Sequence, residues 1–80
     1  MTRNEIFERL NQVFRDIFDD ESIEVTDSTT AADIEDWDSL THIMLLSSVE
    51  DEFGVHFDMK AVQTLKNVGD MADLIEELIG

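Results

Sequence analysis

Apolar residues recur with the period of an α-helix in several segments of this chain, and no proline interrupts them. The first segment spans residues 2–18, where Thr2 with Glu5 three residues later has the pattern of a capping box. Phe7 and Phe18 lie off the apolar face of this segment, and we expect them to cover loop residues. The face itself consists of Ile6, Leu10, Val13, Phe14 and Ile17.

The second helical segment spans residues 38–53. Asp38 suits the N-cap position because its carboxylate can accept a backbone N–H and because acids favour the positive end of the helix dipole. Gly54 follows the segment directly and favours a helix end there. The expected buried stripe consists of Leu45, Val49 and Phe53, widened by Leu46.

The C-terminal part of the chain predicts two further helices, one of them short. Residues 55–65 are ambiguous, and Asp58 is placed to cap a short helix within them. That helix would carry Met59, Val62 and Leu65. Either Asn67 or Asp70 opens a last helix, which ends at Ile79. Its expected apolar face consists of Val68, Met71, Leu74, Ile75 and Leu78.

A long loop is expected between the first and second helices. Residues 19–37 show no clear period and are rich in Asp, Glu, Ser and Thr, which favour turns and caps. A loop of this length is uncommon in a compact domain and is often functional. For Trp37, anchoring the loop is favoured over contacting a partner because its apolar area is large. The expected anchors are Ile23, Val25, Ile34 and Trp37.

The length and charge of the chain limit its partners. Its 80 residues allow one domain, residues 1–80, which the pattern predicts to be all-α. The 20 acidic and 5 basic residues give a formal net charge of −15, which argues against nucleic acid and anionic membranes and favours a basic protein surface. The alternative is that the acids only keep a small protein soluble. Without a membrane-length apolar run or a signal-peptide pattern, we expect a cytoplasmic protein, and we expect it to be monomeric.

Most catalytic arrangements are missing from the sequence. The histidines His42 and His56 have no metal-ligand spacing, cysteine is absent, and no glycine-rich phosphate loop is present, so we predict neither a metal site nor an enzyme. Ser39 follows Asp38 in the first turn of the second helix, where free N–H groups and the helix dipole favour a phosphodiester. It has no evident base, although His42 lies within reach, so we interpret Ser39 as a residue that another enzyme modifies. The alternative is that Asp38 and Ser39 only start a helix.

The tripeptide Asp38-Ser39-Leu40 resembles the phosphopantetheine attachment motif of acyl carrier proteins. The acidic Phe-Gly close at residues 49–55 and the start of the last helix at residues 68–71 are similar to the same family, so the resemblance covers almost the whole chain. It implies a four-helix bundle with three main helices, a short third helix and a long loop between helices 1 and 2. It also implies that a phosphopantetheinyl transferase moves 4′-phosphopantetheine from coenzyme A onto Ser39, with Asp38 near the magnesium ion of that reaction. The arm would then carry acyl groups as thioesters.

The sequence departs from fatty-acid-synthesis carriers at two positions. Thr41 and Met44 stand where those carriers usually have acids, which resembles specialised carriers of lipid, polysaccharide or natural-product pathways. We therefore expect acyl-loading and acyl-transferring partners with basic or mixed basic and apolar surfaces. The alternative is that Ile43 and Met44 tuck against the loop. The expected docking residues are Leu40, Ile43, Met44, Ser47, Glu50 and Asp51.

Two candidates for an acyl pocket and two other functions complete the sequence-based predictions. Leu46 and Val49 are the candidates to line a pocket for the cargo, although ordinary core packing is the favoured role of each. An aminoacyl or peptidyl carrier usually has glycines before the serine, where this chain has Trp37-Asp38. An acidic protein-interaction module with no prosthetic group is the other alternative, and it predicts an unmodified Ser39.

Overall fold

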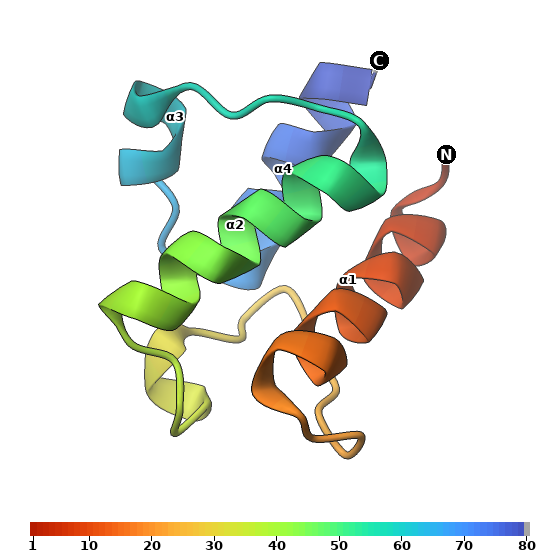
Figure 1. Cartoon of the computed structure of the whole chain (residues 1–80). Coiled ribbons are helices and arrows are strands. Elements are labelled where there is room, and N and C mark those ends of the chain that lie inside the picture. Colours follow the sequence, from red (N-terminus) through yellow and green to blue (C-terminus); the bar gives the residue numbers. More distant parts are fainter. Residues whose placement is uncertain (80) are drawn as a thin grey trace.

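The computed structural model describes residues 1–79, which form four α-helices, one short 3-10 helix and no strand. Figure 1 shows α1 beside α2, with α4 behind α2 and α3 at the edge. The all-α prediction is confirmed, as are the short third helix and the long first loop. Gly80, the last residue of the predicted 1–80 domain, lies outside the described residues. The elements are α1 (Arg3–Phe18), η1 (Ala31–Asp33), α2 (Ser39–Phe53), α3 (Met59–Gln63) and α4 (Val68–Ile79).

The ends of the first two helices follow from local sequence. The Thr2 hydroxyl accepts the N–H of Glu5 at 3.2 Å, and the Glu5 carboxylate accepts the N–H of Thr2 at 3.1 Å. This is the predicted capping box, and it lowers the pKa of Glu5 through the Thr2 N–H and hydroxyl. Gly54 ends α2 in the left-handed region at φ 64°, where a residue without Cβ is unstrained.

The two C-terminal helices also begin at side-chain caps. The Asp58 carboxylate accepts the N–H of Lys60 at 3.1 Å and caps α3 as predicted. The Asn67 side chain accepts the N–H of Asp70 at 2.8 Å, so Asn67 is the one of the two candidate residues that opens α4.

The core lies where the faces of α1, α2 and α4 meet. Phe18 belongs to this core although we expected it outside the apolar face of α1, whereas Ile17 is only half-buried. The reason is that the loop packs against this end of α1: the rings of Phe18 and Trp37 lie 6.2 Å apart. The buried residues are Ile6, Leu10, Val13, Phe14, Phe18, Val25, Leu45, Val49, Phe57, Val68, Met71, Ala72 and Ile75.

The terminal residues of three predicted apolar faces are not buried. Leu78 was expected inside, but it lies at the edge of the α4 stripe and stays 43% exposed, while the small Ala72 nearer the centre of that stripe is buried. Phe53, the last residue of the α2 stripe, is half-buried. Met59, expected on the short helix with Val62 and Leu65, is 74% exposed, and α3 ends at Gln63, before it reaches Leu65.

The long loop is fixed to the helices by apolar anchors and by hydrogen bonds. Val25 is buried, and its N–H donates to the Asn11 side chain at 2.7 Å. Trp37 packs edge-on against Phe14 with ring centroids 5.3 Å apart, which confirms its anchoring role. Ile23 and Ile34, the other two predicted anchors, pack partly buried against the core.

The loop also caps α4 through its backbone. The carbonyl of Thr29 accepts the N–H of Val68 at 2.8 Å, and the carbonyl of Asp27 accepts the N–H of Gly69 at 3.0 Å. A Cβ on Gly69 would lie 2.6 Å from the Asp27 carbonyl oxygen, so only glycine allows this approach. The loop is therefore held against α4 before it enters α2.

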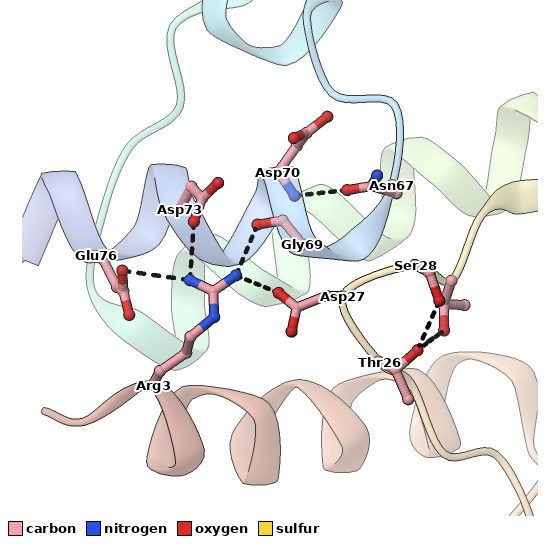
Figure 2. A network of polar contacts seen from close by, with 10 residues as sticks. Arg3, Thr26, Asp27, Ser28, Asn67, Gly69, Asp70, Asp73 and Glu76 are labelled. Atoms are coloured by element: carbon pink, nitrogen blue, oxygen red, sulfur yellow. Dashed lines mark hydrogen bonds and ion pairs between the residues drawn. The ribbon is translucent and has the colours of Figure 1, made fainter.

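Arg3 joins α1, the loop and α4 (Figure 2). Its guanidinium pairs with Asp27 of the loop and with Asp73 at 2.8 Å and Glu76 at 3.3 Å on α4. The hydrogen bond to Asp27, followed by that to Asp73, raises the pKa of Arg3 above its usual value. The group also donates to the Gly69 carbonyl at 3.4 Å, so the contacts of Arg3 reinforce the contact between the loop and α4.

The other two arginines of α1 bind different elements. Arg9 pairs with Glu52 at the end of α2 at 3.3 Å. The Nε of Arg15 donates to the carbonyl of Ile23 in the loop at 2.8 Å. The three arginines of α1 therefore all bind groups within the molecule. Between residues 16 and 59 the sequence contains no Lys or Arg.

Candidate functional site

Ser39 is the first residue of α2. Figure 1 shows that α2 begins on the side of the molecule opposite the start of α1 and the end of α4. Ser39 is exposed, so a second protein can reach its hydroxyl. The loop that delivers the chain to this point is anchored at Trp37, two residues earlier. The serine therefore lies on a surface whose backbone is held on both sides, by the anchored loop and by α2.

Asp38 and Thr41 form a capping box around Ser39. The Asp38 carboxylate accepts the N–H of Thr41 at 2.9 Å, and the Thr41 hydroxyl accepts the N–H of Asp38 at 2.8 Å. The Thr41 N–H, and next the Thr41 hydroxyl, hold the pKa of Asp38 below its usual value. Thr41 thus supplies the side chain that a Glu or Gln supplies in the common capping box, which explains how the helix starts without an acid at this position.

Trp37 and His42 form a hydrogen-bonded pair beside the serine. The indole Nε1–H donates to Nδ1 of His42 at 3.0 Å, and the two rings stack with centroids 5.9 Å apart. Because Nδ1 is the acceptor, the neutral imidazole carries its proton on Nε2. Within residues 1–79 no hydrogen bond joins His42 to Ser39, so the structure shows no base for the serine. Sequence reasoning missed this pair, because nothing in the spacing of Trp37 and His42 specifies the partner of either ring.

One hollow includes the serine, and a second lies farther along α2. The first is a shallow depression around the serine, lined by Ala31, Trp37, Asp38, Ser39, His42 and Ile43. The second is a groove between α2 and α3 whose wall is mainly apolar and includes Leu46, Phe57, Met59 and Val62. Leu46 lies in this groove, whereas Val49 lies fully buried in the core. The pocket role of both residues stays a prediction.

The outer face of α2 next to Ser39 is apolar. Leu40 is 68%, Ile43 67% and Met44 47% exposed, so the alternative that Ile43 and Met44 tuck against the loop is wrong. Ser47 and Asp51 are exposed as well. We call these five residues, Leu40, Ile43, Met44, Ser47 and Asp51, the outer face of α2. Their docking role stays a prediction.

Glu50 differs from the other predicted docking residues. Its side chain is 26% exposed, and its carboxylate accepts the N–H of Phe57 at 2.8 Å. Nδ1 of His56 lies 3.0 Å from the same oxygen. Glu50 therefore also fixes the segment between α2 and α3, a task that its sequence position did not reveal.

The described residues form neither a metal-binding cluster nor a membrane-spanning helix. No cluster of three or more His, Cys, Asp and Glu side chains with the geometry to hold a metal ion occurs in residues 1–79. Over the same residues, no helix is both long enough and apolar enough to cross a bilayer.

Comparisons with known proteins point to one family. Residues 8–75 match the family described as a phosphopantetheine attachment site. The chain is 34% identical over 76 residues to an acyl carrier protein of Coprothermobacter proteolyticus, with 95% of this chain and 93% of the relative covered. It is 31% identical over 77 residues to an acyl carrier protein of Petrotoga mobilis, covering 96% and 91%. The solution structure of a holo acyl carrier protein from Geobacter metallireducens is similar with a TM-score of 0.86 and 44% identity, covering 91% of this chain and 84% of the other.

Proposed function

Because this chain belongs to the acyl carrier protein family, we propose that its 4′-phosphopantetheine arm is attached to Ser39 and serves a specialised pathway. Members of the family carry this group covalently and are carriers, not enzymes. They meet a phosphopantetheinyl transferase and acyl-handling enzymes in turn. We further propose that this chain does so as a cytoplasmic monomer with acyl cargo, which is the cargo that the names of its relatives favour over aminoacyl groups.

The observation that carries the proposal is an exposed serine at a helix start with no base of its own. The residues around Ser39 fit the group: the hydroxyl is accessible, the depression beside it is open, and the apolar groove between α2 and α3 lies along the same helix. The bound arm supplies a thiol, which this cysteine-free chain lacks. Asp38, whose pKa is lowered by its contacts with Thr41, would lie beside the incoming phosphate and its metal ion during transfer.

The specialised role is supported by the chemistry of the outer face of α2. Thr41 belongs to the capping box, and Met44 is an exposed apolar residue, so neither position presents an acid to a partner. Of the predicted acidic contacts, Asp51 is exposed and Glu50 is partly occupied within the chain. A partner for this face would offer apolar side chains with a few basic ones.

The experiment that tests the attachment is intact mass after incubation with coenzyme A, magnesium and a broad-specificity phosphopantetheinyl transferase. The wild type is expected to gain one phosphopantetheine. Ser39→Ala is expected to gain none, whereas Ser47→Ala, which removes another exposed serine of the same helix, is expected to gain one. Arm attachment to Ser39→Ala would refute the assignment. So would a folded, unloaded wild type that two different transferases leave unmodified.

The pathway class is tested with the cognate loading enzyme once genes encoded nearby have identified it. We expect Met44→Glu to weaken loading, because it places a charge on an apolar contact. Asp51→Lys should also weaken it, by removing the exposed acid of the outer face. If Met44→Glu has no effect while charge reversal at Glu50 and Asp51 abolishes binding, the partner recognises acidic side chains as a fatty-acid-synthesis enzyme does, and the proposed specialised pathway is wrong.

A further inference from the structure

The start of α2 offers few donors to an added phosphodiester. Two of its backbone N–H groups are already used, that of Thr41 by the Asp38 carboxylate and that of His42 by the Asp38 carbonyl at 2.8 Å. No Lys or Arg occurs between residues 16 and 59, and the chain has a formal net charge of −15. A phosphodiester on Ser39 therefore enters a surface that is already acidic, next to the Asp38 carboxylate.

One side-chain donor remains beside the serine. Trp37 occupies Nδ1 of His42, and this fixes the proton of the neutral ring on Nε2. Among the residues that the structure describes, Nε2 of His42 forms no hydrogen bond. The other histidine is not available, because His56 lies beyond the end of α2 and contacts Glu50.

The helix geometry brings this donor towards the serine. His42 follows Ser39 by three residues, so the two side chains are neighbours on successive turns. Helical side chains lean towards the N-terminus, so the imidazole covers the turn that contains Ser39. Both residues line the same shallow depression, together with Trp37.

We propose that His42, held as the Nε2–H tautomer by Trp37, donates a hydrogen bond to the phosphodiester of the arm on Ser39. This inference rests on the proposed attachment site and adds a positioning residue to it. The hydrogen bond fixes one phosphate oxygen against the helix and so sets the direction in which the arm leaves the surface. Trp37 acts through His42: without the indole N–H, the proton of the neutral His42 ring would no longer be fixed on Nε2.

The test compares unloaded and loaded protein by NMR of the histidine side chains and of phosphorus. We expect the Nε2–H signal of His42 to move on loading by more than any signal of His56, which serves as the internal control because its side chain is 92% exposed. We also expect contacts between the His42 ring and the methylene protons next to the phosphate. In His42→Phe, which keeps a ring but has no N–H, the phosphorus signal should move and those contacts should disappear.

A second variant separates positioning from folding. Trp37→Phe keeps an aromatic anchor and removes the indole donor, and we expect it to leave the His42 ring as a mixture of tautomers with a smaller response to loading. If mass spectrometry places the arm on Ser39 but the His42 signals do not move, or if folded His42→Phe keeps the phosphorus shift of the wild type, the inference is wrong and the proposed function stands. If the arm is not on Ser39, both are overturned.

Discussion

Gly69→Ala is expected to destabilise the protein, although the same change in most helices is favourable. Replacing a helical glycine by alanine gains about 1 kcal/mol from helix propensity alone. Here the added Cβ would lie 2.6 Å from the carbonyl oxygen of Asp27 and 3.1 Å from its Cα. Both atoms belong to the backbone of the loop, so no flexible side chain can move aside.

The expected loss of stability follows from the movement of the loop backbone that the added Cβ requires. To restore ordinary contact, the loop must retreat from α4 by most of an ångström, which stretches the hydrogen bond from Gly69 to Asp27, now 3.0 Å long. Overpacking of this kind costs about 1–3 kcal/mol, and the weakened hydrogen bond adds about 1 kcal/mol. After subtraction of the propensity gain, we expect a net loss of about 1–3 kcal/mol. For a domain of this size that lowers the Tm by at least about 4 °C.

The assay is urea unfolding of wild type and Gly69→Ala at the same salt concentration, followed by circular dichroism. Gly54→Ala is the matched control: no atom lies within 4 Å of its added Cβ, and its φ of 64° costs about 1–2 kcal/mol through backbone conformation alone. The two variants therefore separate crowding from backbone strain. A Gly69→Ala protein that is as stable as the wild type would refute the close approach of the loop to α4.

Three further predictions concern the core, the first helix cap and the contacts of Arg3. Leu45→Ala, at a fully buried position, should lower the free energy of unfolding by about 2–5 kcal/mol in the same urea assay. Glu5→Gln should be less stable than the wild type at pH 7 and equally stable in acid. The contact with Thr2 lowers the pKa of Glu5 in the folded state. The carboxylate therefore stabilises the protein above the pKa of the unfolded state, and this stabilisation disappears as the pH falls through the pKa of the folded state. A stability difference that persists below both values would contradict this. Arg3→Met should lower the free energy of unfolding by about 1 kcal/mol at low salt and by less at high salt, because its partners such as Asp27 are largely exposed and salt screens them. The measurement is the Tm of both proteins in a sodium chloride series. A Tm difference that does not change with salt would mean that packing, and not charge, gives Arg3 its effect.

Local sequence patterns predicted the helices well because period and caps are local properties. The capping residues Thr2, Asp38 and Asp58 and the end at Gly54 could all be identified from their neighbours alone. The boundary of the core could not, because it depends on which element covers each helix. Phe18 is buried by the loop through Trp37, and no periodicity within α1 contains that information.

The site was predictable as far as its motif, and no further. The position of Ser39 and the cap at Asp38 follow from the sequence. The exposure of Ile43 and Met44 does not, because the sequence also allowed them to pack against the loop. The roles of Thr41, His42 and Glu50 depend on hydrogen bonds whose partners several side chains could have supplied. Choosing among such partners requires the three-dimensional arrangement of the loop and of the α2–α3 segment.

The backbone contact between the loop and α4 has a consequence for the order in which the chain folds. The N–H groups of Val68 and Gly69 form their hydrogen bonds only when the loop places the carbonyls of Thr29 and Asp27 beside them. The first turn of α4 therefore cannot form all its hydrogen bonds without the loop. Contacts between segments so distant along the chain carry a loop-closure cost that slows folding relative to a bundle joined by short turns. In the native state the same two amides exchange with solvent only when the loop detaches. Their deuterium uptake therefore reports the opening of the segment that leads into the serine.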